Sequence, residues 1–260
     1  MEVKLRYCIV IGNVWIGQDM AKKIDRPVGA VVDPLPVGNV PDMRPIHGRW
    51  MRLVPVSAAK HADDLYASFD GKDPENRIWT YMAYGPFLSL EEFTEWLKQR
   101  EAARDPWFYA FVRRDTGRAV GMGAFMRCDA ANGVIEIGHI WMSPDLQQTR
   151  EATEAIYLMM RHCFEDLGVR RLEWKCDSLN APSRRAAERF GFTFEGVFRQ
   201  HFIIKGRNRD TAWYAMLDKE WPAAHRAFEA WLNEANFDGN GTQKAKLRVG
   251  PQAANQRPAV

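Results

Sequence analysis

A junction between a strand-like and a helical stretch, residues 146–155 (LQQTREATEA), carries groups suited to binding a phosphate. A helix N-terminus presents unpaired backbone N–H groups and a partial positive charge, and both attract anions. No glycine lies in this stretch, and Arg150 and Glu151 occupy the first turn of the expected helix. Two interpretations remain open: a phosphate site built on ordinary helical backbone, or a surface helix start in which Arg150 pairs with Glu154.

Two further pairs of residues have side chains that exchange protons or donate hydrogen bonds. Asn180 and Ser183 are three residues apart at an expected helix start, so both face one side of that helix. Glu136 and His139 are also three apart, but on an expected strand, where this spacing predicts opposite faces. Only one of the carboxylate and the imidazole is therefore expected to face a given substrate.

Composition limits the classes of protein to consider. The chain has 260 residues and a net charge of +3, which is too small to indicate nucleic acid as the main partner. The four cysteines and six histidines show no metal-ligand spacing, so we expect no metal site. No apolar run reaches the ~20 residues that span a bilayer, so we expect no membrane association.

The first residues, MEVKLRYCIVIGNVWIG, resemble a secretion signal only weakly. Asn13 interrupts the apolar run and no clear cleavage site follows, so we predict a cytoplasmic protein with reduced cysteines. Met20 is an alternative start, and the sequence leaves open whether residues 1–19 belong to the native protein.

The elements that must position these groups follow from periodicity and turn residues. Residues 24–48 are rich in proline and read as an extended arm. The order expected after it is strand, two helices, a three-stranded antiparallel meander, helix, strand, helix and two strands. In residue ranges these are 49–56, 58–69, 89–105, 106–114, 118–129, 134–142, 150–167, 169–177, 180–192, 192–204 and 211–218.

The last part of the chain is expected to hold one helix and a tail. A helix begins at Pro222 and continues to about Leu232. The polar residues that follow predict disorder. We therefore divide the chain into an arm (1–48), a main domain (49–221), a C-terminal helix (222–235) and a tail (236–260).

Four motifs in this order resemble the GNAT acyltransferases, and in particular their RimJ/RimL-type branch. The motifs are ATEA at residues 152–155, N-x-x-S at 180–183, GF-x-x-EG at 191–196 and RD-x-x-x-Y at 209–214. The resemblance implies an α+β fold with a mixed, mostly antiparallel sheet that is splayed in the middle and flanked by helices. It also implies an enzyme that transfers an acetyl group from acetyl-CoA directly to a primary amine in a ternary complex, without a metal.

The resemblance further implies where acetyl-CoA binds. The pantetheine arm would pair with strand backbone in the splayed region, and the pyrophosphate would lie on the following helix start. Arg150 stands where the family has glycine, so an ordinary helical backbone is expected there. The residues assigned to acetyl-CoA are Ile140, Trp141, Met142, Gln147, Gln148, Thr149, Arg150, Glu151, Ala152, Thr153, Asn180 and Ser183.

The resemblance leaves several candidates for the general base and the general acid. Glu136 matches the family's EIG motif and is the first choice for the general base, with His139 second and His201 a weaker candidate. Many relatives carry a tyrosine acid at the position of Ala187, so Ser183 or a water remains to protonate the thiolate.

The resemblance also suggests which residues shape the pocket for the acceptor amine. The family shapes its acceptor pocket with a loop that here contains Trp79, Tyr81 and Tyr84. Arg199, Arg209 and Asp210 either form an internal charge network or line the acceptor side. The acceptor is a protein N-terminus or a small amine, a homodimer is left open, and a non-catalytic acyl-CoA-binding module is the alternative function.

Overall fold

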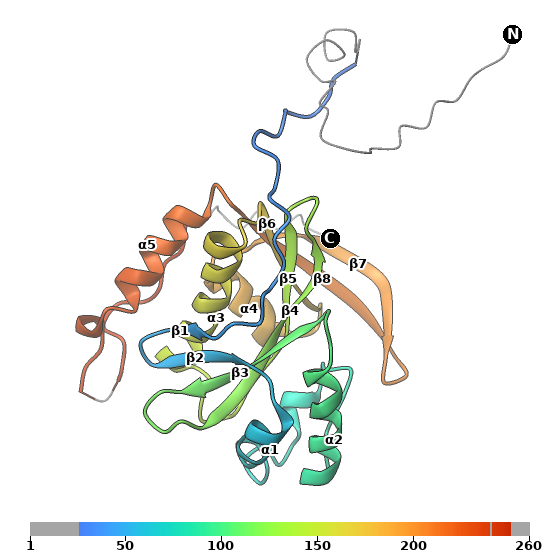
Figure 1. The fold of residues 1–260 in the computed structure, drawn as a ribbon, viewed down its shortest axis with the longest axis vertical. Coiled ribbons are helices and arrows are strands. Elements are labelled where there is room, and N and C mark those ends of the chain that lie inside the picture. The colour runs from blue at the N-terminus through green and yellow to red at the C-terminus, as the bar shows by residue number, and fades with distance from the viewer. Residues whose placement is uncertain (1–25, 240, 251–260) are drawn as a thin grey trace, which may run out of the picture. The chain divides into compact units, whose positions relative to one another are not determined.

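In the computed structural model, which describes residues 26–239 and 241–250, eight strands form one mixed sheet (Figure 1). Their order is β1-β2-β3-β4-β5-β6-β8-β7, and all neighbours are antiparallel except β5 and β6. The strands are β1 (Ile46–His47), β2 (Met51–Pro55), β3 (Trp107–Arg113), β4 (Ala119–Asp129), β5 (Val134–Met142), β6 (Arg171–Asp177), β7 (Thr193–Ile204) and β8 (Arg207–Leu217).

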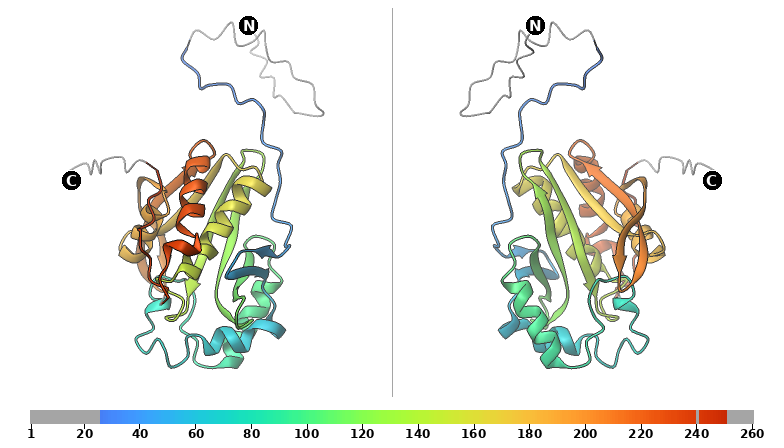
Figure 2. Two further views of the ribbon diagram at one scale, coloured as in Figure 1. Left: turned by 90° about the vertical axis from the view of Figure 1, so that its left-hand side faces the viewer. Right: turned by 90° about the vertical axis from the view of Figure 1, so that its right-hand side faces the viewer.

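Helices cover both faces of this sheet (Figure 2). The helices are α1 (Ala58–Ala67), α2 (Leu90–Glu101), α3 (Arg150–Arg161), α4 (Ala181–Arg189) and α5 (Trp221–Trp231). Helices α1 and α2 pack on one face of β2–β5 in a cluster that contains Phe93, Phe108 and Trp141. Helices α3, α4 and α5 contribute to a second cluster on the opposite face. Short helical segments also occur at Arg77–Trp79, His162–Asp166 and Glu234–Asn236.

The sequence patterns account for most of these elements, and the predicted meander and fold class are confirmed. Ser89 caps α2 by accepting the N–H of Glu92 at 3.1 Å, and Phe93 and Leu97 are buried, as their spacing predicted. Gly168 ends the helical stretch with φ at 66°.

Helix α3 is more deeply buried than its sequence pattern suggested. A single apolar stripe was expected, but every residue from 152 to 160 is buried. The cause is α5, which covers the outer side of α3 and places Phe228 against Tyr157 with ring centroids 5.2 Å apart. A helix packed between a sheet and another helix has little surface left for solvent.

Two stretches differ from the sequence predictions. The polar connection expected at residues 205–210 is only Lys205 and Gly206, because residues 207–210 continue β8. Residues 236–239 and 241–250 were predicted to be disordered, but Phe237 and Leu247 are buried in the core cluster. These buried side chains and hydrogen bonds such as that from the indole N–H of Trp231 to Oε1 of Gln243, at 2.9 Å, hold the segment against the domain.

The N-terminal arm is only partly described. Residues 26–35 form a separate unit without helix or strand, and residues 1–25, including Cys8 and the alternative start, lie outside the described part. Of the other cysteines, Cys163 and Cys176 are buried thiols and Cys128 is half-buried.

Candidate functional site

Strands β5 and β6 pair over only three residues each. The parallel register is Val134 with Arg171, Ile135 with Leu172 and Glu136 with Glu173. Beyond this point β5 pairs only with β4, and β6 pairs only with β8. Figure 1 shows the two strands side by side in the middle of the sheet. The sheet is therefore splayed at the predicted place, and the backbone of residues 140–142 does not pair with β6.

A β-bulge lies in β5 at His139. Ala124 pairs with Gly138 and Met122 with Trp141, so two residues of β5 stand opposite one residue of β4. His139 has φ at 50°, in the left-handed region. After the bulge, the order in which the side chains of β5 point to the two faces of the sheet is shifted by one residue.

The bulge corrects the prediction that Glu136 and His139 face opposite sides of the sheet. Ile135 and Ile137 belong to the α3 side, so Glu136 points to the other face. His139 contacts Phe108, which belongs to the α1–α2 side, with ring centroids 5.1 Å apart. Both candidate bases therefore lie on one face.

The Glu136 carboxylate is buried and ion-paired. Its Oε2 lies 2.9 Å from Nζ of Lys175 and 3.7 Å from Nε of Arg127. Lys175 also approaches Glu173 at 2.6 Å. Burial raises the pKa of Glu136, while the charge of Lys175 opposes the shift. Lys175 therefore holds this carboxylate in place and favours its charged form. This lysine was not predicted from the sequence, although its spacing of two residues from Glu173 on β6 places both side chains on one face.

The imidazole of His139 is held by aromatic neighbours. It stacks on Tyr84 with centroids 5.7 Å apart, and its Nδ1 lies 3.3 Å from the tyrosine Oη. Burial, followed by the charges of three arginines, lowers the pKa of His139 to about 4. The ring is therefore neutral at pH 7. Burial also lowers the pKa of His201, whose ring packs on that of Phe202 with centroids 3.8 Å apart.

The loop between α1 and α2 bridges the two halves of the splayed sheet. Nζ of Lys205, in the β7–β8 turn, donates to the carbonyl of Trp79 at 2.9 Å. The hydroxyl of Tyr81 donates to the carbonyl of Leu179, before α4, at 3.1 Å. The predicted acceptor loop thus lies across the face that carries Glu136 and His139.

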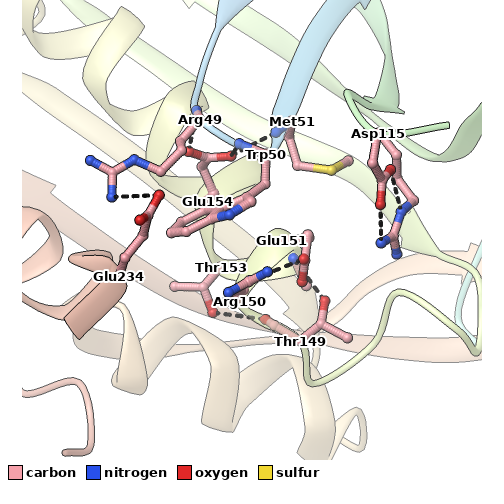
Figure 3. A network of polar contacts seen from close by, with 12 residues as sticks. Arg49, Trp50, Met51, Asp115, Thr149, Arg150, Glu151, Thr153, Glu154 and Glu234 are labelled. Carbon is pink, nitrogen blue, oxygen red and sulfur yellow. Dashed lines mark hydrogen bonds and ion pairs between the residues drawn. The ribbon is translucent and has the colours of Figure 1, made fainter. Parts of the chain in front are cut away.

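On the other face, the start of α3 has the features of an anion site. Thr149 caps the helix by accepting the N–H of Ala152 at 3.1 Å, and its hydroxyl donates to the carbonyl of Leu146 at 2.6 Å (Figure 3). The N–H groups of Arg150 and Glu151 have no acceptor within the described residues. These two groups remain available to a ligand.

Around this helix start the preceding loop is tightly organised. The Gln147 side chain donates to the carbonyl of Met142 at 3.0 Å, and Gln148 has φ at 63°. The left-handed residue is therefore Gln148, whereas Arg150 is the first helical residue, as expected for a position that carries a side chain.

The side chain of Arg150 does not pair with Glu154, contrary to one of the two interpretations. Its Nε lies 3.2 Å from Oε1 of Glu151, and its guanidinium lies over the rings of Trp50 and Phe237 at 4.7 and 5.5 Å (Figure 3). A cavity of about 500 Å³ adjoins it; its lining includes Arg113, Arg114 and Asp115 of the β3–β4 turn.

Glu154 is unavailable to Arg150 because the carboxylate serves the chain's own backbone. It is 3% exposed and accepts the N–H groups of Arg49, Trp50 and Met51 at 2.6, 2.7 and 2.7 Å (Figure 3). Three charge-assisted hydrogen bonds fix α3 to the start of β2.

Arg189 of α4 also reaches the start of α3 and was not predicted. It donates to Oγ1 of Thr153 at 3.1 Å, and its guanidinium lies 5.1 Å from the ring centroid of Trp231. Burial lowers its pKa, and no carboxylate within 4.0 Å pairs with it in the described chain. No local sequence pattern indicates this contact, because it joins residues 36 positions apart.

Asn180 and Ser183 lie at the start of α4, as predicted. Oδ1 of Asn180 accepts the N–H of Ser183 at 3.1 Å. Oγ of Ser183 accepts the indole N–H of Trp174 at 3.0 Å and lies beside the thiol of Cys176. Because the serine oxygen accepts the bond from Trp174, its hydroxyl proton stays free to be donated to another acceptor, such as the sulfur of Cys176. Ala187 is fully buried in the core.

Two further observations concern metals and membranes. Among residues 26–239 and 241–250, no group of three or more histidine, cysteine or carboxylate side chains is arranged to hold a metal ion. None of the helices in that part of the chain is both long and apolar enough to cross a membrane.

Comparison with known proteins identifies the family. A family model described as Acetyltransferase (GNAT) domain matches residues 51–193. The crystal structure of a GCN5-related N-acetyltransferase from Brucella melitensis is similar with a TM-score of 0.80 and 47% identity, over 83% of this chain and 96% of that one.

Curated relatives match at lower identity. YdaF of Bacillus subtilis (strain 168) is 30% identical over 105 residues, which make up 40% of this chain and 57% of YdaF. The ribosomal-protein-serine acetyltransferase of Escherichia coli (strain K12) is 25% identical over 147 residues, or 55% of this chain and 82% of that protein.

Proposed function

Because this chain belongs to the GNAT family and is an acetyltransferase, we propose that it transfers the acetyl group of acetyl-CoA to a primary amine. The observation that carries the proposal is the separation of β5 from β6 directly before the free N–H groups of α3. One face at this point presents helix starts, and the other presents Glu136 and His139.

The residues near α3 fit a pyrophosphate and a pantetheine arm. The N–H groups of Arg150 and Glu151 would donate hydrogen bonds to the pyrophosphate oxygens, and Arg189 would supply positive charge. The backbone of residues 140–142 would pair with the amides of the arm, since the Trp141 side chain itself is buried in the core. Acetyl-CoA supplies an activated thioester to this site.

The acceptor side fits proton removal from an amine. In the transfer, a neutral nitrogen forms a bond to the thioester carbon, the carbon–sulfur bond breaks, and the nitrogen loses a proton. Glu136 would take that proton directly or through water, and His139 would orient the amine with its neutral ring. Ser183, held by the indole N–H of Trp174, would relay a proton from water to the leaving thiolate, regaining from the water the proton that it gives up.

We propose a protein N-terminal amine as the first acceptor to test. The Escherichia coli relative is named for acetylating a ribosomal protein serine, in agreement with the predicted RimJ/RimL branch. An α-amine has a pKa of about 8, so much more of it is neutral at pH 7 than of lysine, whose pKa is about 10.4. A partly ion-paired carboxylate is a sufficient base for such a group.

A thiol-release assay with peptides and small amines tests the proposal. Steady production of CoA with an amine supports it, whereas tight acetyl-CoA binding without turnover on any amine would favour the non-catalytic alternative. Glu136→Gln is expected to lower kcat by about 100-fold or more and to change its pH profile. Glu173→Gln, which removes another carboxylate from Lys175, is the matched control: it should keep kcat and only shift the profile to lower pH, because the charge of Glu173 raises the pKa of Glu136.

A further inference from the structure

An arginine of α2 lies beside His139 without an acidic partner. The guanidinium carbon of Arg100 is 6.0 Å from the ring centroid of Phe108, which also contacts His139. It lies 5.2 Å from the ring of Trp96. Its Nε is buried without a hydrogen-bond partner, and no carboxylate within 4.0 Å pairs with it among the described residues.

Two more arginines lie near the candidate bases: Arg127 of β4 reaches Glu136 at 3.7 Å, and Arg209 of β8 packs on the same phenylalanine ring as Arg127. The guanidinium carbons of Arg127 and Arg209 lie 5.6 and 5.7 Å from the ring centroid of Phe202. Together with Arg100 they act on the charge of His139, although burial is the larger effect on its pKa. Three elements therefore direct positive charge to the face where the amine would react.

The charges of Asp177 and Glu136 act on Arg209, but among the described residues no carboxylate forms an ion pair with Arg100 or Arg209. Glu136 is paired with Lys175 at 2.9 Å and reaches Arg127 only at 3.7 Å. Arg209 donates its Nε–H to Oγ1 of Thr211 at 3.2 Å and forms no ion pair within the described chain.

Arg209 and its neighbour Asp210 do not form the charge network considered from the sequence. The Asp210 carboxylate accepts the N–H of Gln200 at 2.7 Å and the side chain of Asn208 at 2.9 Å instead. Adjacent strand residues point to opposite faces, so Arg209 is turned toward Phe202. Half-buried guanidinium groups without anions are unfavourable, and an anionic ligand group would relieve this.

We propose that the acceptor carries a carboxylate within a few bonds of the reacting amine, and that Arg100 and Arg209 bind it. The proposal rests on the amine acetylation proposed above and names its substrate class. Arginine suits this role because its planar fork matches a carboxylate. The carboxylate belongs either to an acidic side chain near a peptide N-terminus or to the free terminus of a very short peptide.

Four acceptors separate these sources. One pair is a C-terminally amidated peptide beginning Ser-Asp and its Ser-Asn counterpart; the other is a free Ser-Ala dipeptide and its C-terminal amide. In each pair only the charge changes. We expect kcat/KM to be about tenfold or more higher for the carboxylate member of at least one pair, as for charge-assisted hydrogen bonds. The pair that shows the difference identifies the source.

Variants connect the preference to the two arginines. Arg209→Gln and Arg100→Gln should bring the ratio of kcat/KM within the responding pair close to one, and Arg209→Lys should retain part of it. Arg118→Gln, on the exposed β3–β4 turn, is the control that should keep the wild-type ratio. If the glutamine variants fail to fold, raising the salt concentration should reduce the wild-type ratio.

Equal kcat/KM within both pairs for the wild-type enzyme would overturn the inference but not the proposed acetylation. Absence of CoA release with every amine would instead overturn the proposed function. A preference that survives both glutamine variants would assign the carboxylate to other residues and also reject the inference.

Discussion

Replacing Glu154 by glutamine should destabilise the domain by an amount that can be worked out from its hydrogen bonds. Oε2 accepts two N–H groups, from Trp50 and Met51, and Oε1 accepts that of Arg49. The best placement of the amide keeps its oxygen on the first two and turns its NH₂ toward the third. One hydrogen bond is then lost, and the other two lose their charge assistance.

The expected loss is about 3 kcal/mol. An unmade bond at a partly buried N–H contributes about 1–3 kcal/mol, and two weakened bonds contribute roughly 0.5–1 kcal/mol each. For a domain of this size the loss corresponds to a fall in Tm of roughly 6–12 °C. Urea and thermal unfolding, followed by circular dichroism, measure both quantities.

Glu151→Gln is the matched control for this prediction, because it removes the same charge from the same helix. Among the described residues Glu151 forms one ion pair, with Arg150, and glutamine keeps an oxygen that can accept from the same guanidinium, so the free energy of unfolding should change by less than about 1 kcal/mol. A Glu154→Gln protein within about 0.5 kcal/mol of wild type would refute the assignment of three functional bonds to this carboxylate.

Three other predictions concern the site. The folded pKa of His139, about 4, is below its usual value, so the unfolded chain binds more protons between about pH 6.5 and 4. The free energy of unfolding should therefore decrease as the pH falls through this window, by at most about 3 kcal/mol, and urea unfolding of His139→Gln should lack this part of the decrease. Asn180→Ala should lower stability by about 1 kcal/mol through loss of the cap and weaken acetyl-CoA binding in calorimetry; unchanged affinity would remove its binding role. Arg150→Ala and Arg150→Gly should both keep CoA affinity within about threefold if backbone N–H groups hold the phosphates, and a large loss in both would implicate the guanidinium.

Local sequence patterns predicted the order of strands and helices because each depends on neighbouring residues. The cap at Ser89, the helix stop at Gly168 and the cap at Asn180 each act within a few positions. The splayed sheet was predicted only through resemblance, since the paired residues of β5 and β6, such as Val134 and Arg171, are far apart in the sequence and their pairing depends on tertiary contacts.

The features missed by the sequence analysis depend on distant partners. In the bulge the left-handed backbone belongs to His139 and not to the neighbouring Gly138, so the sequence does not indicate it; the His139 ring packs against Phe108. An i,i+4 rule favoured Arg150 as the partner of Glu154, but the carboxylate instead binds backbone about 100 positions earlier. Phe237 is held by rings of the core rather than by its polar neighbours.

The separation of β5 and β6 also has a consequence for inhibition kinetics. For the proposed reaction, the nucleotide end of one substrate approaches over α3 and α4, while the other substrate approaches from the face crossed by the Trp79–Tyr81 loop. The two substrates then occupy separate entrances and meet only where the strands diverge. Free CoA should compete with acetyl-CoA but not with the amine, and an acetylated peptide should compete with the amine alone.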